Sequence, residues 1–351
     1  MMKDGVADTH PALVGRQHEM AVLWSRFEES TAGRLQVALV AGEPGIGKTR
    51  LLQEVARRPE ERGATVLYGG ASEAEGMPPY LPFLEALGQH IRVATPGEVL
   101  EQTGVMASVL GAILPELSLR LGELPPGYPL PPEQARLRLY EAVGTFLAAV
   151  AAPYALLLVL DDLQWADTAT LDLLCHVARH QPEARLLVLG AYREGEVTHR
   201  PLFERALTEL TRLRRLTTIT LGTLTVTEMA TLAASVLGAP LDPAARASLS
   251  TQSEDNPFFA EELLWGWLET GVIARWGGTF GLVPSVDSTL PSSIVNAVRQ
   301  RLARLSPEVI DLLHTAAIIG RTFNGALLAE VAAQEAEAVE EHQTDLSHVP
   351  G

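Results

Sequence analysis

The chain has almost no cysteine and almost no lysine. Cys175 is the single cysteine in 351 residues, which excludes a disulfide framework and indicates a reducing compartment, the cytoplasm. Lysine occurs only as Lys3 and Lys48, whereas the other 25 basic residues are arginines, so the place of Lys48 is informative. The first ten residues lack the apolar segment of a secretory signal peptide.

Positive charge is also scarce. The 27 basic and 43 acidic residues give a formal net charge of −16. Surfaces that bind nucleic acid or anionic lipid need a positive face, so this balance argues against both partners. Hydrophobic residues make up 47% of the chain, which excludes global disorder, and the length suffices for two or three packed units.

One uncharged stretch could be mistaken for a membrane span. Residues 142–160 carry no charge and are long enough in principle to cross a bilayer. Pro153 interrupts the stretch, Asp161 and Asp162 end it, and no cluster of arginine or lysine borders it. We therefore predict a helix end, a break and a buried strand, with no membrane partner.

Apolar runs of strand length alternate with helical patterns as far as residue 221. Uniformly apolar strands with helical crossovers predict an α/β fold with a parallel sheet that is covered on both faces. The long gap between the second and third strands leaves room for one more strand, which the pattern does not locate. The predicted strands are residues 36–41, 64–69, 155–160, 185–192 and 217–221.

Shorter helices follow the last predicted strand. Residues 225–228 form a capping box, which predicts a helix start. Residues 271–283 predict a β-hairpin that turns at a Gly-Gly pair. Further helices are predicted from Ile294 and after Ser306, and the acidic segment from Gln334 onward is expected to fray.

Residues 42–49, GEPGIGKT, match the P-loop pattern GxxxxGK[ST] at every fixed position, between a predicted strand and a predicted helix. The glycines let the backbone curl so that its amides point at a phosphate, and the helix N-terminus adds its dipole. Lys48 would bind the β- and γ-phosphates, and the Thr49 hydroxyl would be a ligand for Mg²⁺. The alternative, a chance match in an ordinary glycine turn, is disfavoured by the flanking elements.

Two carboxylates follow the third predicted strand. In this arrangement Asp161 is predicted to hold Mg²⁺, usually through water, and Asp162 to orient or deprotonate the attacking water. The alternative is that both merely cap the next helix, but Asp167 already has the position and chemistry of that cap.

Arg193 follows the fourth predicted strand. It is predicted to contact the γ-phosphate as a sensor, and the alternative is a surface arginine paired with Glu194 or Glu196. His176 and His180 have a spacing that can bind zinc, but no third ligand is evident near them, so we predict no metal site there.

Six motifs, in this order, resemble those of STAND-class regulatory ATPases. The resemblance is greatest to the ATPase module of large LuxR-type transcriptional regulators and of bacterial cyclase- and kinase-linked proteins, which is also described as an AAA-type, origin-recognition-like ATPase. The motifs are LVGR (13–16), AGEPGIGKTRLL (41–52), LLVLDDLQWAD (157–167), LGAYRE (189–194), DNPFFAEELL (255–264) and the segment 290–323.

The resemblance implies an α/β P-loop NTPase core of the additional-strand type, followed by an α-helical lid and a winged-helix-like domain. Members of the family continue into repeats or an effector domain, so the end at Gly351 suggests a fragment, a truncated product or a stand-alone remnant. The corresponding ranges are 1–12 for a flexible N-terminus, 13–195 for the core, 196–268 for the lid, 269–333 for the winged helix and 334–351 for a frayed or truncated tail.

The resemblance also implies that Val14 and Gly15 lie near the adenine and that Pro257 packs on the nucleotide from the lid. This chain departs from the family at Asp255, where glycine is frequent. The predicted catalytic residues are Lys48, Asp162 and Arg193, and the predicted metal ligands are Thr49 and Asp161. The predicted nucleotide-binding set is Val14, Gly15, Gly42, Glu43, Pro44, Gly45, Ile46, Gly47, Lys48, Thr49, Arg50 and Pro257.

We therefore expect an ATP- and Mg²⁺-binding regulatory switch with slow ATP hydrolysis, in which ATP favours an open, assembly-competent state and ADP a closed one. Its expected partners are nucleotide, further copies of the chain, and an effector protein or C-terminal domain.

Three other functions are open: a DNA-binding AAA-type initiator or loader, a small-molecule phosphotransferase, and an ATP-binding scaffold without turnover. Residues 290–333 carry four arginines and three acids, a net charge of +1, so DNA binding is not expected through this segment. The helical extension after residue 222 argues against a phosphotransferase.

Overall fold

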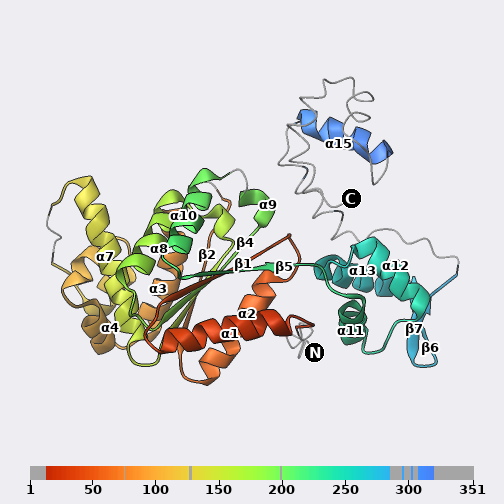
Figure 1. The fold of residues 1–351 in the computed structure, drawn as a ribbon, viewed down its shortest axis with the longest axis horizontal. Helices are drawn as coiled ribbons and strands as arrows, with labels where there is room; N and C mark the ends of the chain where they lie inside the picture. Colours follow the sequence, from red (N-terminus) through yellow and green to blue (C-terminus); the bar gives the residue numbers. More distant parts are fainter. Residues whose placement is uncertain are drawn as a thin grey trace, which may run out of the picture. The chain divides into compact units, whose positions relative to one another are not determined.

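The computed structural model describes residues 13–74, 76–125, 129–197, 200–284, 295, 302 and 307–319. They belong to two units, of which the first ends at Leu224 and the second begins at Thr225 (Figure 1). The predicted helix start at Ile294, most of the predicted winged helix and the acidic tail lie outside the described residues.

A five-stranded parallel sheet forms the centre of the first unit. Its strand order is β2-β3-β4-β1-β5, so β4 lies between β1 and β3, as expected for an additional-strand P-loop core. The predicted fold class is confirmed for this unit, and helices occupy the described part of the gap between β2 and β3, with no further strand there. The strands are β1 (Gln36–Gly42), β2 (Thr65–Gly70), β3 (Leu156–Asp161), β4 (Leu186–Tyr192) and β5 (Leu216–Leu221).

Helices cover both faces of this sheet because side chains of each strand alternate between two apolar cores. Val37 and Leu39 face the core formed with α3, α7, α8 and α10, whereas Ala38 and Val40 face the core formed with α1 and α2. The helices of the two layers are α1 (Gln17–Thr31), α2 (Lys48–Glu61), α3 (Leu81–Val93), α7 (Pro132–Ala151), α8 (Thr168–His180) and α10 (Pro201–Arg212).

Shorter helices complete the first unit. The uncharged stretch 142–160 is the end of α7 followed by β3, and no helix within the described ranges has the length and apolar character needed to span a bilayer. The shorter elements are α4 (Pro96–Thr103), η1 (Gly104–Met106), α5 (Ala107–Gly111), α6 (Glu116–Leu121), η2 (Leu163–Trp165) and α9 (Glu194–Val197).

The P-loop core extends beyond residue 195, where the family resemblance placed its end. Strand β5 pairs along its length with β1, and α10 packs on α8, so both elements belong to the first unit. The part of the predicted lid before residue 222 therefore belongs to the first unit, since a strand of the central sheet cannot belong to a separate domain.

The second unit contains a three-helix cluster and the predicted hairpin. The capping box is present, because Thr225 Oγ1 accepts a hydrogen bond from Glu228 N and the Glu228 carboxylate accepts one from Thr225 N. Trp267 and Leu264 are fully buried on α13, where they form the centre of the cluster. The elements are α11 (Val226–Leu237), α12 (Pro243–Ser253), α13 (Pro257–Thr270), β6 (Ile273–Trp276), β7 (Thr279–Leu282) and α15 (Pro307–Ile319).

The contact between β2 and α3 depends on a glycine and gives a stability prediction. A Cβ atom at Gly69 would lie 1.8 Å from the backbone oxygen of Pro82. We expect Gly69→Ala to lower the free energy of unfolding by about 1–3 kcal/mol or more, because the backbone of α3 must move away from β2 to make room for the methyl group. Urea denaturation measures this change.

A matched control is Gly97→Ala in α4, where an added Cβ meets no atom within 4 Å. It should change stability by less than about 1 kcal/mol. Equal effects of the two substitutions would contradict the packing of α3 on β2.

Candidate nucleotide-binding site

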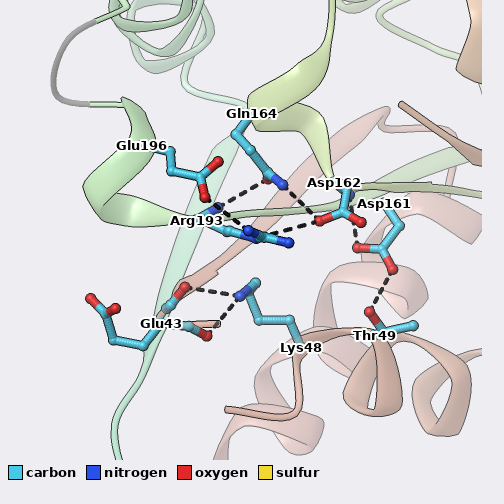
Figure 2. A network of polar contacts seen from close by, with 9 residues as sticks. Glu43, Lys48, Thr49, Asp161, Asp162, Gln164, Arg193 and Glu196 are labelled. Carbon is cyan, nitrogen blue, oxygen red and sulfur yellow. Dashed lines mark hydrogen bonds and ion pairs between the residues drawn. The ribbon is translucent and has the colours of Figure 1, made fainter. Parts of the chain in front are cut away.

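The predicted site residues meet at the carboxyl edge of the sheet. The P-loop follows β1, Asp161 ends β3, and Arg193 follows β4, the strand between the other two. Because the strands are parallel, these three positions lie at the same edge, where α/β proteins bind their ligands. Figure 2 shows the side chains of Lys48, Thr49, Asp161 and Arg193 close together.

Glycine is required in the P-loop for two different reasons. Gly45 and Gly47 have φ values of 80° and 98°, which disfavour residues with a side chain. A Cβ atom at Gly42 would lie 3.0 Å from Ile46 Cγ2 and 3.1 Å from the Leu221 oxygen, so close packing excludes one. The loop leads directly into α2 at Lys48, which gives the helix N-terminus that an anion can bind.

Lys48 is a buried cation at this edge. Its side chain is held by two backbone oxygens, because Nζ donates to Gly42 O and Glu43 O at 2.9 Å each. Burial lowers the pKa of Lys48, and the positive charge of Arg193 lowers it further, while nearby carboxylates oppose that change. A buried ammonium in this position fits an anionic ligand, since a phosphate charge would restore the stability of its charged form.

Thr49 and Asp161, the predicted metal ligands, form a hydrogen-bonded pair. The Thr49 hydroxyl donates to Asp161 Oδ2 at 2.6 Å, and Asp161 Oδ1 accepts the N–H of Asp162 at 2.8 Å. Burial raises the pKa of Asp161, while these two hydrogen bonds lower it. A hydroxyl and a carboxylate are the hard oxygen donors that Mg²⁺ prefers, so the pair fits this cation.

Asp162 and Arg193 also approach each other. The Nε atom of Arg193 lies 3.9 Å from Asp162 Oδ1, and its Nη1 atom forms an ion pair with Glu196 at 2.8 Å. Arg193 therefore faces the site. It also forms the ion pair with Glu196 that the alternative interpretation, a surface arginine paired with a glutamate, requires. Its role as a γ-phosphate sensor remains a prediction.

The remaining P-loop residues divide by exposure. Ile46 is buried against the core under α2, whereas Glu43 and Gly45 are exposed at the surface of the loop. Pro44, which lies between them, and Arg50, in the first turn of α2, are partly buried.

Two further residues that contact the candidate site are buried and polar, and the sequence alone does not indicate them. Gln164, within the QWAD part of its motif, is fully buried and contacts both Asp162 and Arg193 N. Arg16, the last residue of LVGR, donates to Gly222 O at 2.5 Å and to Ile46 O at 3.5 Å. Arg16 is the one polar residue of LVGR, whereas Gln164 lies among Asp161, Asp162 and Asp167, so its motif gives no signal that singles it out.

Arg16 also locates the segment predicted to lie near the adenine. Val14 and Gly15 directly precede Arg16, whose contact with Ile46 O connects this segment to the P-loop. Gly15 and Arg16 both have positive φ values, 68° and 65°, so the chain turns sharply before α1. Contact between this segment and an adenine remains a prediction.

Pro257 lies in the second unit, at the first position of α13 after the cap Asn256. Its contact with a nucleotide therefore remains a prediction. Asp255, which departs from the family, has a φ of 59°, and its Oδ1 atom accepts a hydrogen bond from Ser250 at 2.6 Å. The left-handed backbone explains why glycine is frequent here, and Asp can adopt it at modest cost.

Cys175 and His176 of α8 are buried, whereas His180 is exposed. His176 and His180 stack with ring centroids 4.2 Å apart, and no group of three potential metal ligands occurs in the described part of the chain. Burial raises the pKa of Cys175 to about 12, so its thiol is not activated.

A family profile described as AAA ATPase domain matches residues 12–189. An uncharacterized protein of Rhizobium meliloti (strain 1021) is 26% identical over 182 residues, which cover 48% of this chain and 17% of that protein. This chain therefore corresponds to a small part of that relative.

Two solved structures share the fold at low similarity. A mutant RuvB of Thermotoga maritima has a TM-score of 0.42 and 15% identity, over 93% of this chain and 85% of its own. A replication initiator DnaA bound to AMPPCP and single-stranded DNA has a TM-score of 0.44 and 12% identity, over 98% of this chain and 93% of its own.

The lowered pKa of Lys48 predicts proton uptake on ligand binding. An anion that stabilises the ammonium raises this pKa, so binding of ADP at alkaline pH should take up protons, and affinity should fall as pH rises through the pKa of the free protein. Titration calorimetry in buffers of different ionisation enthalpy measures the uptake.

Lys48→Ala should abolish this uptake and weaken ADP binding by about 1.5–3 kcal/mol. The matched control is Arg57→Ala, which removes an exposed cation from the same helix and should change neither quantity. Unchanged uptake in Lys48→Ala would assign the proton to another group.

Proposed function

The chain belongs to the AAA ATPase domain family, and from this premise we propose that it is an ATP- and Mg²⁺-binding regulatory switch that hydrolyses ATP slowly. The hydrogen bond between Thr49 and Asp161, next to the buried Lys48 ammonium, carries the proposal. It joins the P-loop helix to the acidic end of β3, so phosphate-binding and metal-binding groups share one site.

Each group has a separate role in the proposed site. The P-loop amides and Lys48 bind the β- and γ-phosphates, while Val14 and Gly15 lie near the adenine. Thr49 and Asp161 hold Mg²⁺, which when bound neutralises charge on the phosphate oxygens. Arg193 contacts the γ-phosphate, and the buried Lys48 ammonium, held by Gly42 O and Glu43 O, supports binding of an anion beside it.

Hydrolysis uses Asp162 as the general base. A water oxygen forms a bond to the γ-phosphorus as the bond from this phosphorus to the β–γ bridging oxygen breaks, and the bonding electron pair leaves with ADP. Asp162 accepts one proton of the water, and phosphate is the second product. The side chain of Asp162 is 43% exposed, which supports access of water to it.

The regulatory part of the proposal concerns the second unit. Residues 225–268 would form the lid and residues 269–333 a winged-helix-like domain, with Pro257 packed on the nucleotide. ATP and ADP shift such an equilibrium only through their different affinities for the two states. The ordered motifs of STAND-class ATPases support this assignment, together with nucleotide-dependent self-association and an effector partner or domain.

Turnover distinguishes this proposal from an ATP-binding scaffold. We expect Asp162→Asn to retain ATP affinity and to lose kcat by about 10²–10⁴-fold, because it removes the proton acceptor and keeps the shape. A phosphate-release assay and a binding titration measure the two quantities. Wild-type protein that binds ATP with Mg²⁺ but never releases phosphate would identify a scaffold.

The switch has its own prediction. Wild-type protein with ADP and protein with a non-hydrolysable ATP analogue should differ in protease digestion pattern and in assembly state. Lys48→Ala serves as the control, since it should show one pattern with either nucleotide. Identical patterns and identical mass in the wild type would reject the switch while leaving the ATPase intact.

A further inference from the structure

We propose that Gln164 is a positioning residue that aims the Asp162 carboxylate for proton transfer and couples it to the backbone at Arg193. This inference rests on the proposed ATPase function. It concerns an uncharged residue that neither phosphate chemistry nor metal binding requires.

The amide of Gln164 bridges the ends of two neighbouring strands (Figure 2). Its Nε2 atom donates to Asp162 Oδ1 at 2.7 Å, beyond β3, and its Oε1 atom accepts the N–H of Arg193 at 3.1 Å, beyond β4. A carboxylate can only accept and a backbone N–H can only donate, so these partners dictate which way the amide faces. Both groups of the amide are used on residues of the proposed site.

The bond to Gln164 limits the freedom of an otherwise poorly held carboxylate. The side chain of Asp162 is 43% exposed, and its backbone has a φ of 53°, in the left-handed region. Oδ1 accepts from Gln164 and faces Arg193 Nε, whereas Oδ2 has no hydrogen-bond partner within the part of the chain that the structure describes. One oxygen is therefore anchored and the other is left to accept a proton from water.

Gln164 is itself held rigidly. It is fully buried in η2, and the preceding Leu163 packs so tightly on Gly190 of β4 that a Cβ there would lie 2.5 Å from Leu163 Cδ1. The guanidinium of Arg200 donates to Gln164 O and lies over the Trp165 ring, 5.1 Å from its centroid. A fixed backbone on both sides makes the amide a defined support for Asp162.

A purely structural role would need only the acceptor half of the amide, which satisfies Arg193 N. Positioning needs the donor half as well. Gln164→Glu separates a structural role from a positioning role. It keeps the shape of the side chain and the oxygen that accepts from Arg193 N, but it replaces the amide NH2 donor by a carboxylate oxygen. Gln164→Met keeps the length and removes both.

The experiment measures kcat, KM and melting temperature of full-length variants as a function of pH. At about pH 8 both variants should lose kcat by about 10- to 100-fold, with KM near the wild-type value. The melting temperature should fall, because each variant removes at least one hydrogen bond of a buried amide, and it serves to show that the variants are folded at the assay temperature. As pH falls, the introduced carboxyl takes up a proton and can donate to Asp162. Hence kcat of Gln164→Glu relative to wild type should recover, whereas that of Gln164→Met should stay low.

Gln89→Glu is the matched control. Gln89 also accepts a backbone N–H, that of Tyr68, but it lies away from Asp162, so this variant should keep wild-type kcat at every pH. A double-mutant cycle with Asp162→Asn tests the coupling. If Gln164 acts through Asp162, adding Gln164→Met to Asp162→Asn should cause little further loss of kcat.

Two results would overturn the inference. The first is a wild-type kcat in both Gln164 variants. The second is a loss of kcat that is equal in both variants, does not change with pH and is fully additive to the loss caused by Asp162→Asn. The single variant Asp162→Asn reports on the proposed function by itself. If it retains wild-type kcat, the general base is wrong. If it loses kcat and the cycle is additive, only the role of Gln164 is wrong.

Discussion

The hydrogen bond from Thr49 to Asp161 connects the two halves of the site. It joins the first turn of α2, the helix that follows β1, to the end of β3, although β1 and β3 are separated in the sheet by β4. Such a bond requires parallel strands in register, so that their carboxyl ends meet at one edge. The buried strands and their two helical layers thus fix the contact between the Thr49 hydroxyl and the Asp161 carboxylate at the carboxyl edge of the sheet.

Charges at this edge are balanced within a small volume. Lys48 and Arg193 supply two cations, and Asp161, Asp162 and Glu196 supply carboxylates. Burial shifts the pKa values of Lys48 and Asp161 toward their neutral forms, while neighbouring charges and hydrogen bonds oppose this shift. A site of this kind is suited to a ligand that carries both an anion and a divalent cation.

Much of this arrangement could be predicted from the sequence because it is encoded locally. The P-loop pattern, the apolar strands and the acidic pair after β3 each occupy a short segment, and parallel topology brings their ends together. Gln164 could not be found in this way, because its partner N–H at Arg193 is 29 residues away and an amide carries no charge to mark it. The partner of Arg16 at Gly222 is 206 residues away, which no local pattern can indicate.

The end of the core was placed too early for a related reason. The strand TTITL was predicted, but β5 is an edge strand with exposed threonines at positions 218 and 220, so its membership in the sheet depends on pairing with β1 and not on burial. The extra strand that the gap allowed is replaced by short helices, whose apolar faces are hard to distinguish from strands by periodicity alone.

Strand β5 has a practical consequence for anyone who shortens this chain. A fragment that ends at residue 195 would uncover one whole side of β1, a strand that is buried along nearly its entire length. Unpaired backbone groups on an apolar strand are a template for intermolecular pairing, so the fragment would tend to aggregate. The fragment would also lack Gly222, whose carbonyl accepts a hydrogen bond from the Arg16 guanidinium. A fragment that contains the candidate site should therefore end after Gly222.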